Sequence, residues 1–211
     1  MAKLPNNGCC YAPLLRTNCK GIVQKILDDM SKNWFSVGEA MNKQEKSLPP
    51  TAVLYRWWFP EDSEVCNAIR KHSEDILKQV EKRTIDKDGK IDKDGKLYYA
   101  LYFGKSNKGS RRYNQHTNGT VGNSTIRHTV YGLVFPSKQY DPDEEQKISD
   151  IVRQCYCEWV AINGAEGANW IGCLESICIA LGNYPLNVDG NPAIGKAWRK
   201  VLLDARKISK K

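Results

Sequence analysis

No apolar stretch of this sequence approaches the ~20 residues that a membrane-spanning helix requires. The first ten residues, MAKLPNNGCC, also lack the charged and then apolar regions of a signal peptide. We therefore expect a cytoplasmic protein that makes no membrane contact. With 211 residues, 41% hydrophobic and 27% charged, the composition is that of a globular domain with a buried core.

The eight cysteines include no C-x-x-C pair, so the spacing typical of a zinc site is missing. Cys9, Cys10, Cys155 and Cys157 supply enough thiols for one zinc ion. Reduced thiols packed in the core are nevertheless the better interpretation, because a cytoplasmic location disfavours disulfides.

Acidic residues are absent between Lys105 and Arg127, a segment with five basic residues and His116. From Ala193 onward, only Asp204 opposes seven basic residues. With a net charge of +8, two basic stretches favour a polyanionic partner, although charge runs are commonly solvated surface. The residues that we expect to contact nucleic acid are Lys108, Arg111, Arg127, Lys196, Arg199, Lys200 and Lys207.

The first half of the chain predicts helices and one clear strand. Apolar positions at helical spacing predict a helix over residues 20–44, with a break near Gly38. The β-branched and aromatic residues of 51–59 predict a strand, and a second helix starts from Ser63.

A tandem repeat, IDKDGKIDKDGK, occupies residues 85–96 and contains two Asp-Gly turns. Its D-x-D spacing resembles a calcium loop, but the closing bidentate Glu is missing. We interpret the repeat as a polar hairpin or a flexible connector. The next segment, LYYALYFG, predicts a strand that Gly104 ends.

The second half of the chain alternates helices with one further strand. Ser110 is a candidate cap for a short helix over 111–117, and Asn123 or Ser124 begins the next helix. The acidic segment DPDEEQKISD opens a helix that reaches about Gln154. The remaining elements are a strand at 155–162, an apolar helix ended by Gly182 and a basic C-terminal helix. This order predicts an α/β domain on a small sheet.

Several candidate catalytic residues follow one another in a distinctive order. A strand ending in Tyr102-Phe103-Gly104-Lys105 is followed by Arg112 and His116, one helical turn apart. Glu175 interrupts the later apolar helix, and Pro185-Leu186-Asn187 comes just past it. Each residue alone has a structural interpretation, but an unpartnered carboxylate among apolar residues costs roughly several kcal/mol and calls for a metal or an arginine. Together these residues resemble the catalytic core of the GIY-YIG nuclease family.

The resemblance implies a three-stranded antiparallel sheet flanked by helices, with one active site on its face. The catalytic core would cover residues 51–190, with a helical insert at about 61–96. Residues 1–50 would then be a helical N-terminal extension, and residues 191–211 a basic C-terminal helix.

The first tyrosine of the family normally lies about a dozen residues before the second. The best candidate here is Tyr55, which precedes Tyr102 by 47 residues, with Tyr98 and Tyr99 as alternatives. If the insert leaves and rejoins a sheet edge, the strands of Tyr55 and Tyr102 pair.

Phosphodiester hydrolysis requires a deprotonated water and cations around the phosphate and the leaving oxygen. The resemblance and the residue types assign Glu175 to one Mg²⁺, for which Mn²⁺ can substitute, and Arg112 to the phosphate.

The remaining residues of the expected catalytic set would transfer protons or hold the phosphate in position. Tyr55 or Tyr102 takes the proton of the water if Lys105 lowers its pKa. His116, on the same helix face as Arg112, binds the phosphate or shuttles a proton. Asn187 completes the expected catalytic set.

A compact core with short additions best suits a stand-alone type II restriction endonuclease. Such enzymes commonly cut palindromic double-stranded DNA as homodimers, because a two-fold protein matches a two-fold site. The alternatives are a non-catalytic nucleic-acid-binding module on the same fold and a repair or RNA-processing nuclease. The intact set of Arg112, His116, Glu175 and Asn187 argues against the first alternative.

Overall fold

The computed structural model describes residues 19–43, 48–86, 95–136, 139–162, 165–192 and 194–208. Two predictions fall outside these residues: the turns of the tandem repeat between Asp86 and Gly95, and zinc binding by Cys9 and Cys10. The strands on either side of the repeat do pair with each other.

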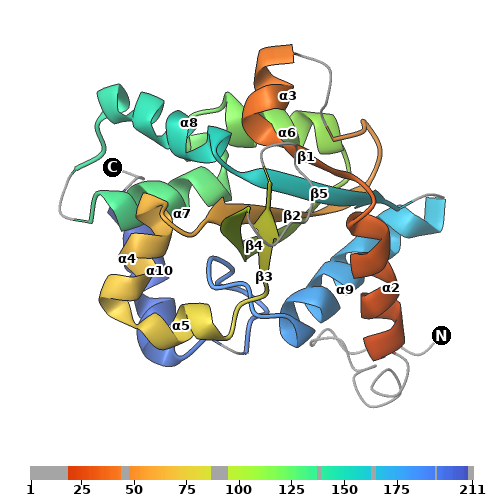
Figure 1. Ribbon diagram of the computed structural model, residues 1–211. Helices are drawn as coiled ribbons and strands as arrows, with labels where there is room; N and C mark the ends of the chain where they lie inside the picture. Colours follow the sequence, from red (N-terminus) through yellow and green to blue (C-terminus); the bar gives the residue numbers. More distant parts are fainter. Residues whose placement is uncertain are drawn as a thin grey trace, which may run out of the picture.

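The described residues contain one antiparallel sheet of five strands, in the order β1-β5-β2-β4-β3 (Figure 1). The strands are β1 Trp34–Ser36, β2 Val53–Pro60, β3 Lys82–Ile85, β4 Lys96–Ser106 and β5 Tyr156–Ala161. The predicted three-stranded sheet is therefore wrong, because β1 and β3 add one strand at each edge. Sequence periodicity missed both strands because they are only 3 and 4 residues long.

The central strand β2 is buried along its whole length, which explains its nearly continuous apolar sequence. Its one charged residue, Arg56, is 0% exposed and forms an ion pair with the equally buried Glu158 of β5. Arg83 of β3 also reaches Glu158, at 2.9 Å. Such a buried charge is tolerated only when it is paired in this way.

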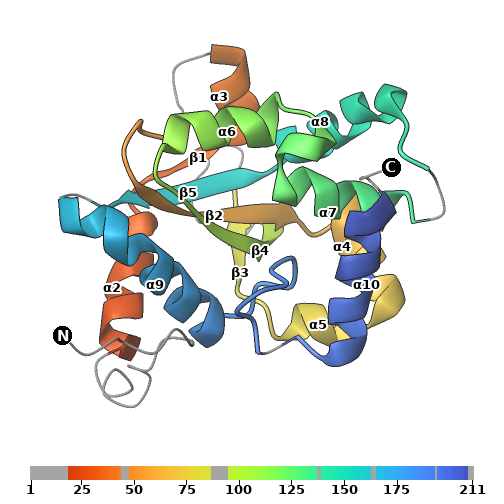
Figure 2. The same ribbon diagram turned by 180° about the vertical axis from the view of Figure 1, so that it is seen from behind.

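Nine α-helices of the described residues surround the sheet. They are α2 Cys19–Met30, α3 Val37–Lys43, α4 Glu64–His72, α5 Glu74–Lys78, α6 Gly109–Thr117, α7 Thr125–Val134, α8 Glu145–Arg153, α9 Ala165–Leu181 and α10 Lys196–Ile208. Helices α3, α6 and α8 lie on one side of the sheet and α2 and α9 on the other (Figures 1 and 2). Helices α4, α7 and α10 pack together beside the end of β2 that leads into α4.

Some helix boundaries differ from the sequence predictions. The helix predicted over 20–44 is interrupted by β1, where Trp34 and Phe35 pair with β5. Ser110 does not cap α6, which begins at Gly109 after Lys108 and has no side-chain cap. Ser124 does cap α7, because its hydroxyl accepts a hydrogen bond from the backbone N–H of Arg127 at 3.3 Å.

The terminal additions share the core of the domain. Strand β1 belongs to the predicted N-terminal extension yet pairs with β5, and the predicted C-terminal helix α10 packs on α7. At Gly132 of α7, an added Cβ would lie 2.1 Å from the carbonyl oxygen of Ala205, so the two backbones are in close contact. Both additions are therefore parts of one packed unit.

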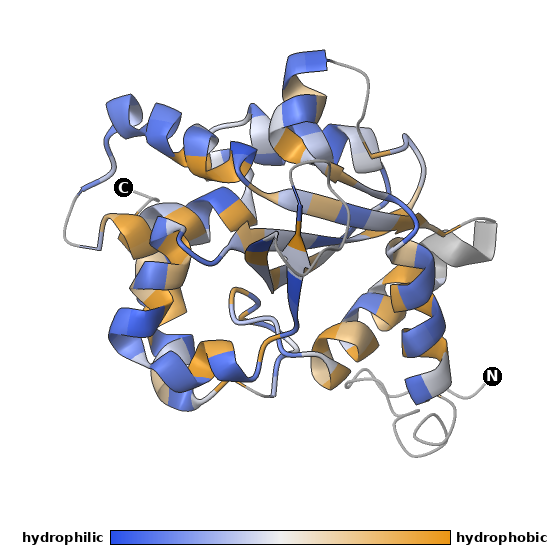
Figure 3. Cartoon of the chain, viewed as in Figure 1, coloured by the Kyte–Doolittle hydropathy of each residue, from blue (hydrophilic) through white to orange (hydrophobic). Residues whose placement is uncertain are grey.

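Hydrophobic and hydrophilic residues alternate along the helices and strands (Figure 3), and the buried apolar residues come from both kinds of element. Cys155 and Cys157 are buried, and burial raises the pKa of both thiols, as is typical of core cysteines. Within the described ranges, no helix has the length and apolar character needed to cross a membrane.

Candidate active site

The two candidate tyrosines lie on neighbouring strands. β2 pairs with β4, with Tyr55 opposite Gly104 and Tyr102 opposite Trp57, so the predicted pairing of these strands is confirmed. The ring centroids of Tyr55 and Tyr102 are 6.4 Å apart. A Cβ atom at Gly104 would lie 2.7 Å from the Tyr55 hydroxyl, so the glycine of the motif makes room for this ring.

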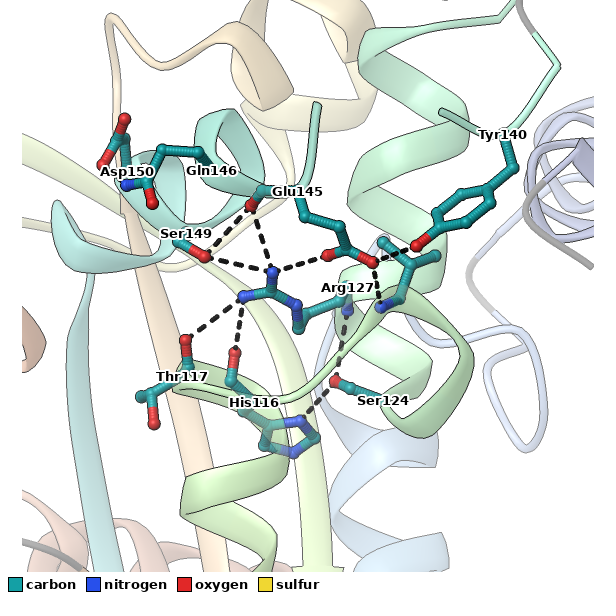
Figure 4. Close-up of polar contacts among 10 residues, drawn as sticks. His116, Thr117, Ser124, Arg127, Tyr140, Glu145, Gln146, Ser149 and Asp150 are labelled. Carbon is teal, nitrogen blue, oxygen red and sulfur yellow. Dashed lines mark hydrogen bonds and ion pairs between the residues drawn. The ribbon is translucent and has the colours of Figure 1, made fainter. Parts of the chain in front are cut away.

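His116 of α6 contacts Tyr55 and is itself held by Ser124. Its Nε2 atom lies 3.0 Å from Tyr55 Oη. Its Nδ1 atom lies 2.6 Å from Ser124 Oγ (Figure 4). His116 is 1% exposed, and burial, aided by Arg112 and Arg127, lowers its pKa to about 3. The imidazole is therefore neutral at physiological pH, and its burial argues against the predicted direct contact with phosphate.

Both tyrosine hydroxyls are protonated in the resting site. Burial is the main cause that raises the pKa of Tyr55 well above its ordinary value, and burial also raises the pKa of Tyr102. Glu175 adds to both shifts, whereas Arg112 opposes both. Arg206 and a hydrogen bond with Tyr55 further lower the pKa of Tyr102. The cations that oppose the rise in tyrosine pKa are thus arginines, whereas the sequence analysis gave this role to Lys105.

Glu175 of α9 lies beside Lys105 of β4, with 3.6 Å between Glu175 Oε2 and Lys105 Nζ. Burial raises the pKa of Glu175, while Lys105 and then Arg112 act against this shift. Gly172, on the preceding helical turn, leaves space for the lysine, because an added Cβ would lie 2.8 Å from Nζ. A partly buried carboxylate with a raised pKa is a place where a further cation binds favourably.

A hollow of about 250 Å³ opens beside Glu175, lined also by Tyr102, Asn187 and Arg206. Tyr55 is not among the lining residues, so Tyr102 is the tyrosine that faces this space. The part of the chain that the structure describes contains no group of three or more His, Cys, Asp or Glu that could hold a metal. One carboxylate with water and phosphate oxygens is, however, a ligand set that Mg²⁺ accepts, so Glu175 fits a single Mg²⁺.

Asn187 is a positioning residue in this geometry. Its side chain accepts a hydrogen bond from the N–H of Phe103 at 2.8 Å and donates one to the carbonyl of Phe103 at 2.7 Å. This pair of bonds joins the segment after α9 to β4, next to Tyr102. Asn187 thus lines the hollow while its amide group is engaged with the backbone.

Arg112 and His116 lie one turn apart on α6, as the sequence suggested. Arg112 is partly buried and acts electrostatically on Tyr55, His116 and Glu175. Its neighbour Arg111 is exposed. The structure therefore directs Arg112 toward the site and Arg111 toward the solvent.

Arg127 does not fit the nucleic-acid contact that we predicted from the sequence. It is 1% exposed, and its guanidinium forms an ion pair with Glu145 at 2.8 Å and a hydrogen bond to Ser149 at 3.1 Å (Figure 4). It also donates to the carbonyl oxygens of His116 and Thr117. Charge counting missed this role because a sequence does not distinguish a buried cation from a solvated one.

The other predicted DNA contacts lie at the surface. Lys108 and Arg111 are exposed, as are Lys196, Arg199, Lys200 and Lys207, which we call the α10 cations. Among these, Arg199 lies 3.7 Å from Asp189, and Lys207 lies 2.8 Å from Asp204. Contact between these residues and DNA remains a prediction.

Arg206 is the site residue that the sequence analysis did not single out. It reaches from α10 to the hollow and donates hydrogen bonds to Thr129 Oγ1 at 2.9 Å and to the carbonyl of Leu186 at 3.3 Å. A signal was present, because Arg206 follows the buried Leu202 by one helical turn and so continues the inward face.

Comparisons with known proteins agree with this geometry. A family model described as the GIY-YIG catalytic domain matches residues 53–208, a region that includes both tyrosines and α10. Searches of the curated proteins and of the solved structures gave no significant match. The matched region covers most of the sequence and implies a nuclease of the general kind. The chain belongs to the GIY-YIG nuclease family.

Proposed function

We propose that this protein is a metal-dependent endonuclease that hydrolyses phosphodiester bonds in double-stranded DNA. The observation that carries the proposal is the position of Glu175. Its partly buried carboxylate shares one hollow with Tyr102 and Arg206, with Lys105 at 3.6 Å. A module that only binds DNA gains nothing from a carboxylate at this place, because it repels phosphate.

Glu175 would hold one Mg²⁺, for which Mn²⁺ can substitute. When bound, the ion polarises the phosphate and offsets the negative charge of the leaving oxygen. Lys105 keeps the carboxylate of Glu175 in place, and Arg112 and Arg206 bind the phosphate oxygens and stabilise the charge that develops on them.

Tyr102 would take the proton of the attacking water, because it is the tyrosine that lines the hollow. The reaction then starts from the fraction of molecules in which Tyr102 has released its own proton to bulk water. Tyr55 supports the phenolate of Tyr102, because its ring lies beside that of Tyr102, with 6.4 Å between the centroids, and lowers the pKa of Tyr102. Asn187 fixes the backbone of β4 beside them.

The finer proposal is a type II restriction endonuclease that acts as a homodimer. Its support is the net charge of +8, which favours a polyanionic partner such as DNA. Lys108, Arg111 and the α10 cations would contact the DNA backbone and set affinity without reading the bases.

Incubation of the protein with plasmid DNA, and in parallel with RNA, tests these proposals; each substrate is incubated with Mg²⁺, with Mn²⁺ or with a chelator. Discrete fragments with either metal, and none with the chelator, would support the restriction enzyme. A smear would indicate a non-specific or repair nuclease, and an intact plasmid beside cleaved RNA would indicate an RNA-processing nuclease. A plasmid that is bound but not cut under any condition would refute catalysis and leave the binding module.

A further inference from the structure

Ser124 connects the candidate site to the start of α7. Its Oγ atom lies 2.6 Å from His116 Nδ1 and also accepts a hydrogen bond from the backbone N–H of Arg127 at 3.3 Å (Figure 4). Ser124 is 1% exposed. The same hydroxyl therefore serves as a helix cap and as a partner of the buried imidazole.

Counting protons decides which atom donates in each contact. The N–H of Arg127 can only donate, so Ser124 Oγ is the acceptor in that bond. The single proton of the buried hydroxyl needs an acceptor of its own, because an unsatisfied buried donor is unfavourable. Among the hydrogen bonds of the described residues, His116 Nδ1 is the acceptor within reach. Ser124 therefore donates to Nδ1.

The position of the imidazole proton follows from this assignment. A neutral histidine carries one ring proton, and Nδ1 is already accepting, so the proton is on Nε2. Nε2 lies 3.0 Å from Tyr55 Oη. His116 thus donates to the oxygen of Tyr55, so the proton of Tyr55 is not used in this contact.

We propose that Ser124 is a positioning residue that fixes the Nε2–H tautomer of His116, so that His116 acts as a hydrogen-bond donor to Tyr55 and not as its base. The proposal rests on the proposed nuclease function and deepens it. The donors run from Ser124 through His116 to Tyr55, whose ring lies beside that of Tyr102 with 6.4 Å between the centroids. The donation from Ser124 keeps the imidazole neutral, and the donation from His116 makes Tyr55 a better donor in turn. Tyr55 lowers the pKa of Tyr102, so this arrangement stabilises the phenolate of Tyr102.

The tautomer can be measured without any substrate. In ¹⁵N-labelled protein, long-range ¹H–¹⁵N spectra distinguish a protonated ring nitrogen from an unprotonated one. The chain has 3 histidines, and the signals of His116 are those that disappear in His116→Gln. We expect protonated Nε2 and unprotonated Nδ1 in the unaltered protein; the opposite pattern would overturn the proposal.

Variants of Ser124 test whether this residue fixes the tautomer. Ser124→Ala should give a mixture of tautomers and lower the cleavage rate by roughly tenfold, the effect of one lost hydrogen bond. It should also move the pH–rate profile to higher pH, because the phenolate loses support. Ser124→Thr retains the hydroxyl and should restore both the tautomer and the profile.

Ser63 provides a matched control, because it is a buried cap of α4 that accepts from the backbone N–H of Cys66 at 3.2 Å. Ser63→Ala should lower the melting temperature much as Ser124→Ala does, with no change in the tautomer or in the pH–rate profile. If Ser124→Ala keeps the Nε2–H tautomer, the proposal is wrong. An unaltered protein that cleaves no DNA would refute the proposed function alone, since the spectra would still report the tautomer.

Discussion

Replacing Glu175 with Gln should separate activity from stability. The ion pair with Lys105 is long, 3.6 Å, and joins side chains that are 41% and 21% exposed, so it stabilises the fold by only about 0–1 kcal/mol. Burial raises the pKa of Glu175, so the ionised carboxylate is unfavourable in the folded state, and Gln removes this cost. We expect Glu175→Gln to unfold within about 1 kcal/mol of the parent.

The activity of the same variant should fall by more than about a hundredfold, or ~2.7 kcal/mol in the activation free energy. DNA binding should survive, because the carboxylate serves the metal ion and not the duplex. Single-turnover cleavage and denaturant unfolding measure the two effects. A variant that still cuts at more than about a hundredth of the parent rate would refute Glu175 as the metal ligand.

Glu145→Gln is the matched control, because Glu145 pairs with the buried Arg127 at 2.8 Å. This substitution leaves a buried charge without its partner and should cost about 3–5 kcal/mol of stability. The folded protein should nevertheless keep most of its cleavage activity, since Glu145 lies outside the hollow.

The stability changes caused by Glu175→Gln and by Glu145→Gln should depend on pH with opposite signs. Burial raises the pKa of Glu175, so its contribution to stability is present at acid pH and is lost as pH rises through that pKa. The free energy of unfolding of Glu175→Gln, relative to that of the parent, should therefore be highest at neutral pH. The pKa of Glu145 is lowered, although burial opposes the hydrogen bonds with Arg127 and Tyr140 that lower it. Its contribution is present at neutral pH and is lost on acidification, so the deficit of Glu145→Gln should shrink at acid pH.

Three further predictions concern the remaining residues. Arg112→Ala should abolish cleavage through lost charge stabilisation, whereas Arg111→Ala should have a smaller effect. Single-turnover cleavage rates of the two variants test this, and a worse defect at Arg111 would contradict the helix register. Tyr102→Phe should slow cleavage by about 10²–10⁴-fold, as expected for a lost general base. Tyr55→Phe should slow it by roughly tenfold, as expected for one lost hydrogen bond. Equal cleavage rates in the two variants would refute this division of roles. Replacing the α10 cations with Gln should weaken binding to all DNA sequences alike. The slope of the logarithm of the binding constant against the logarithm of the salt concentration should become shallower by about 0.9 per lost contact. An unchanged salt titration would show that this helix face is ordinary solvated surface.

The sequence alone predicted much of the site, because its residues follow short local patterns. The Tyr-x-Gly-Lys strand end, the Arg-His spacing and the carboxylate inside an apolar helix are each readable within a few residues. These patterns also placed the strands β2, β4 and β5 and the cap at Ser124. Local spacing and side-chain chemistry were sufficient for these features, since both depend on near neighbours in the chain.

The tertiary structure decided what depends on contacts between distant segments. Arg127 and Arg206 are both arginines in basic stretches, yet packing buries the first against Glu145 and directs the second to the hollow. The edge strand β1 exists because β5 supplies its partner, against a local helical pattern. The proton on His116 is likewise set by Ser124 and Tyr55, from separate elements. Burial and hydrogen-bond partners are properties of the folded chain, and they decide which residues of one chemical type act.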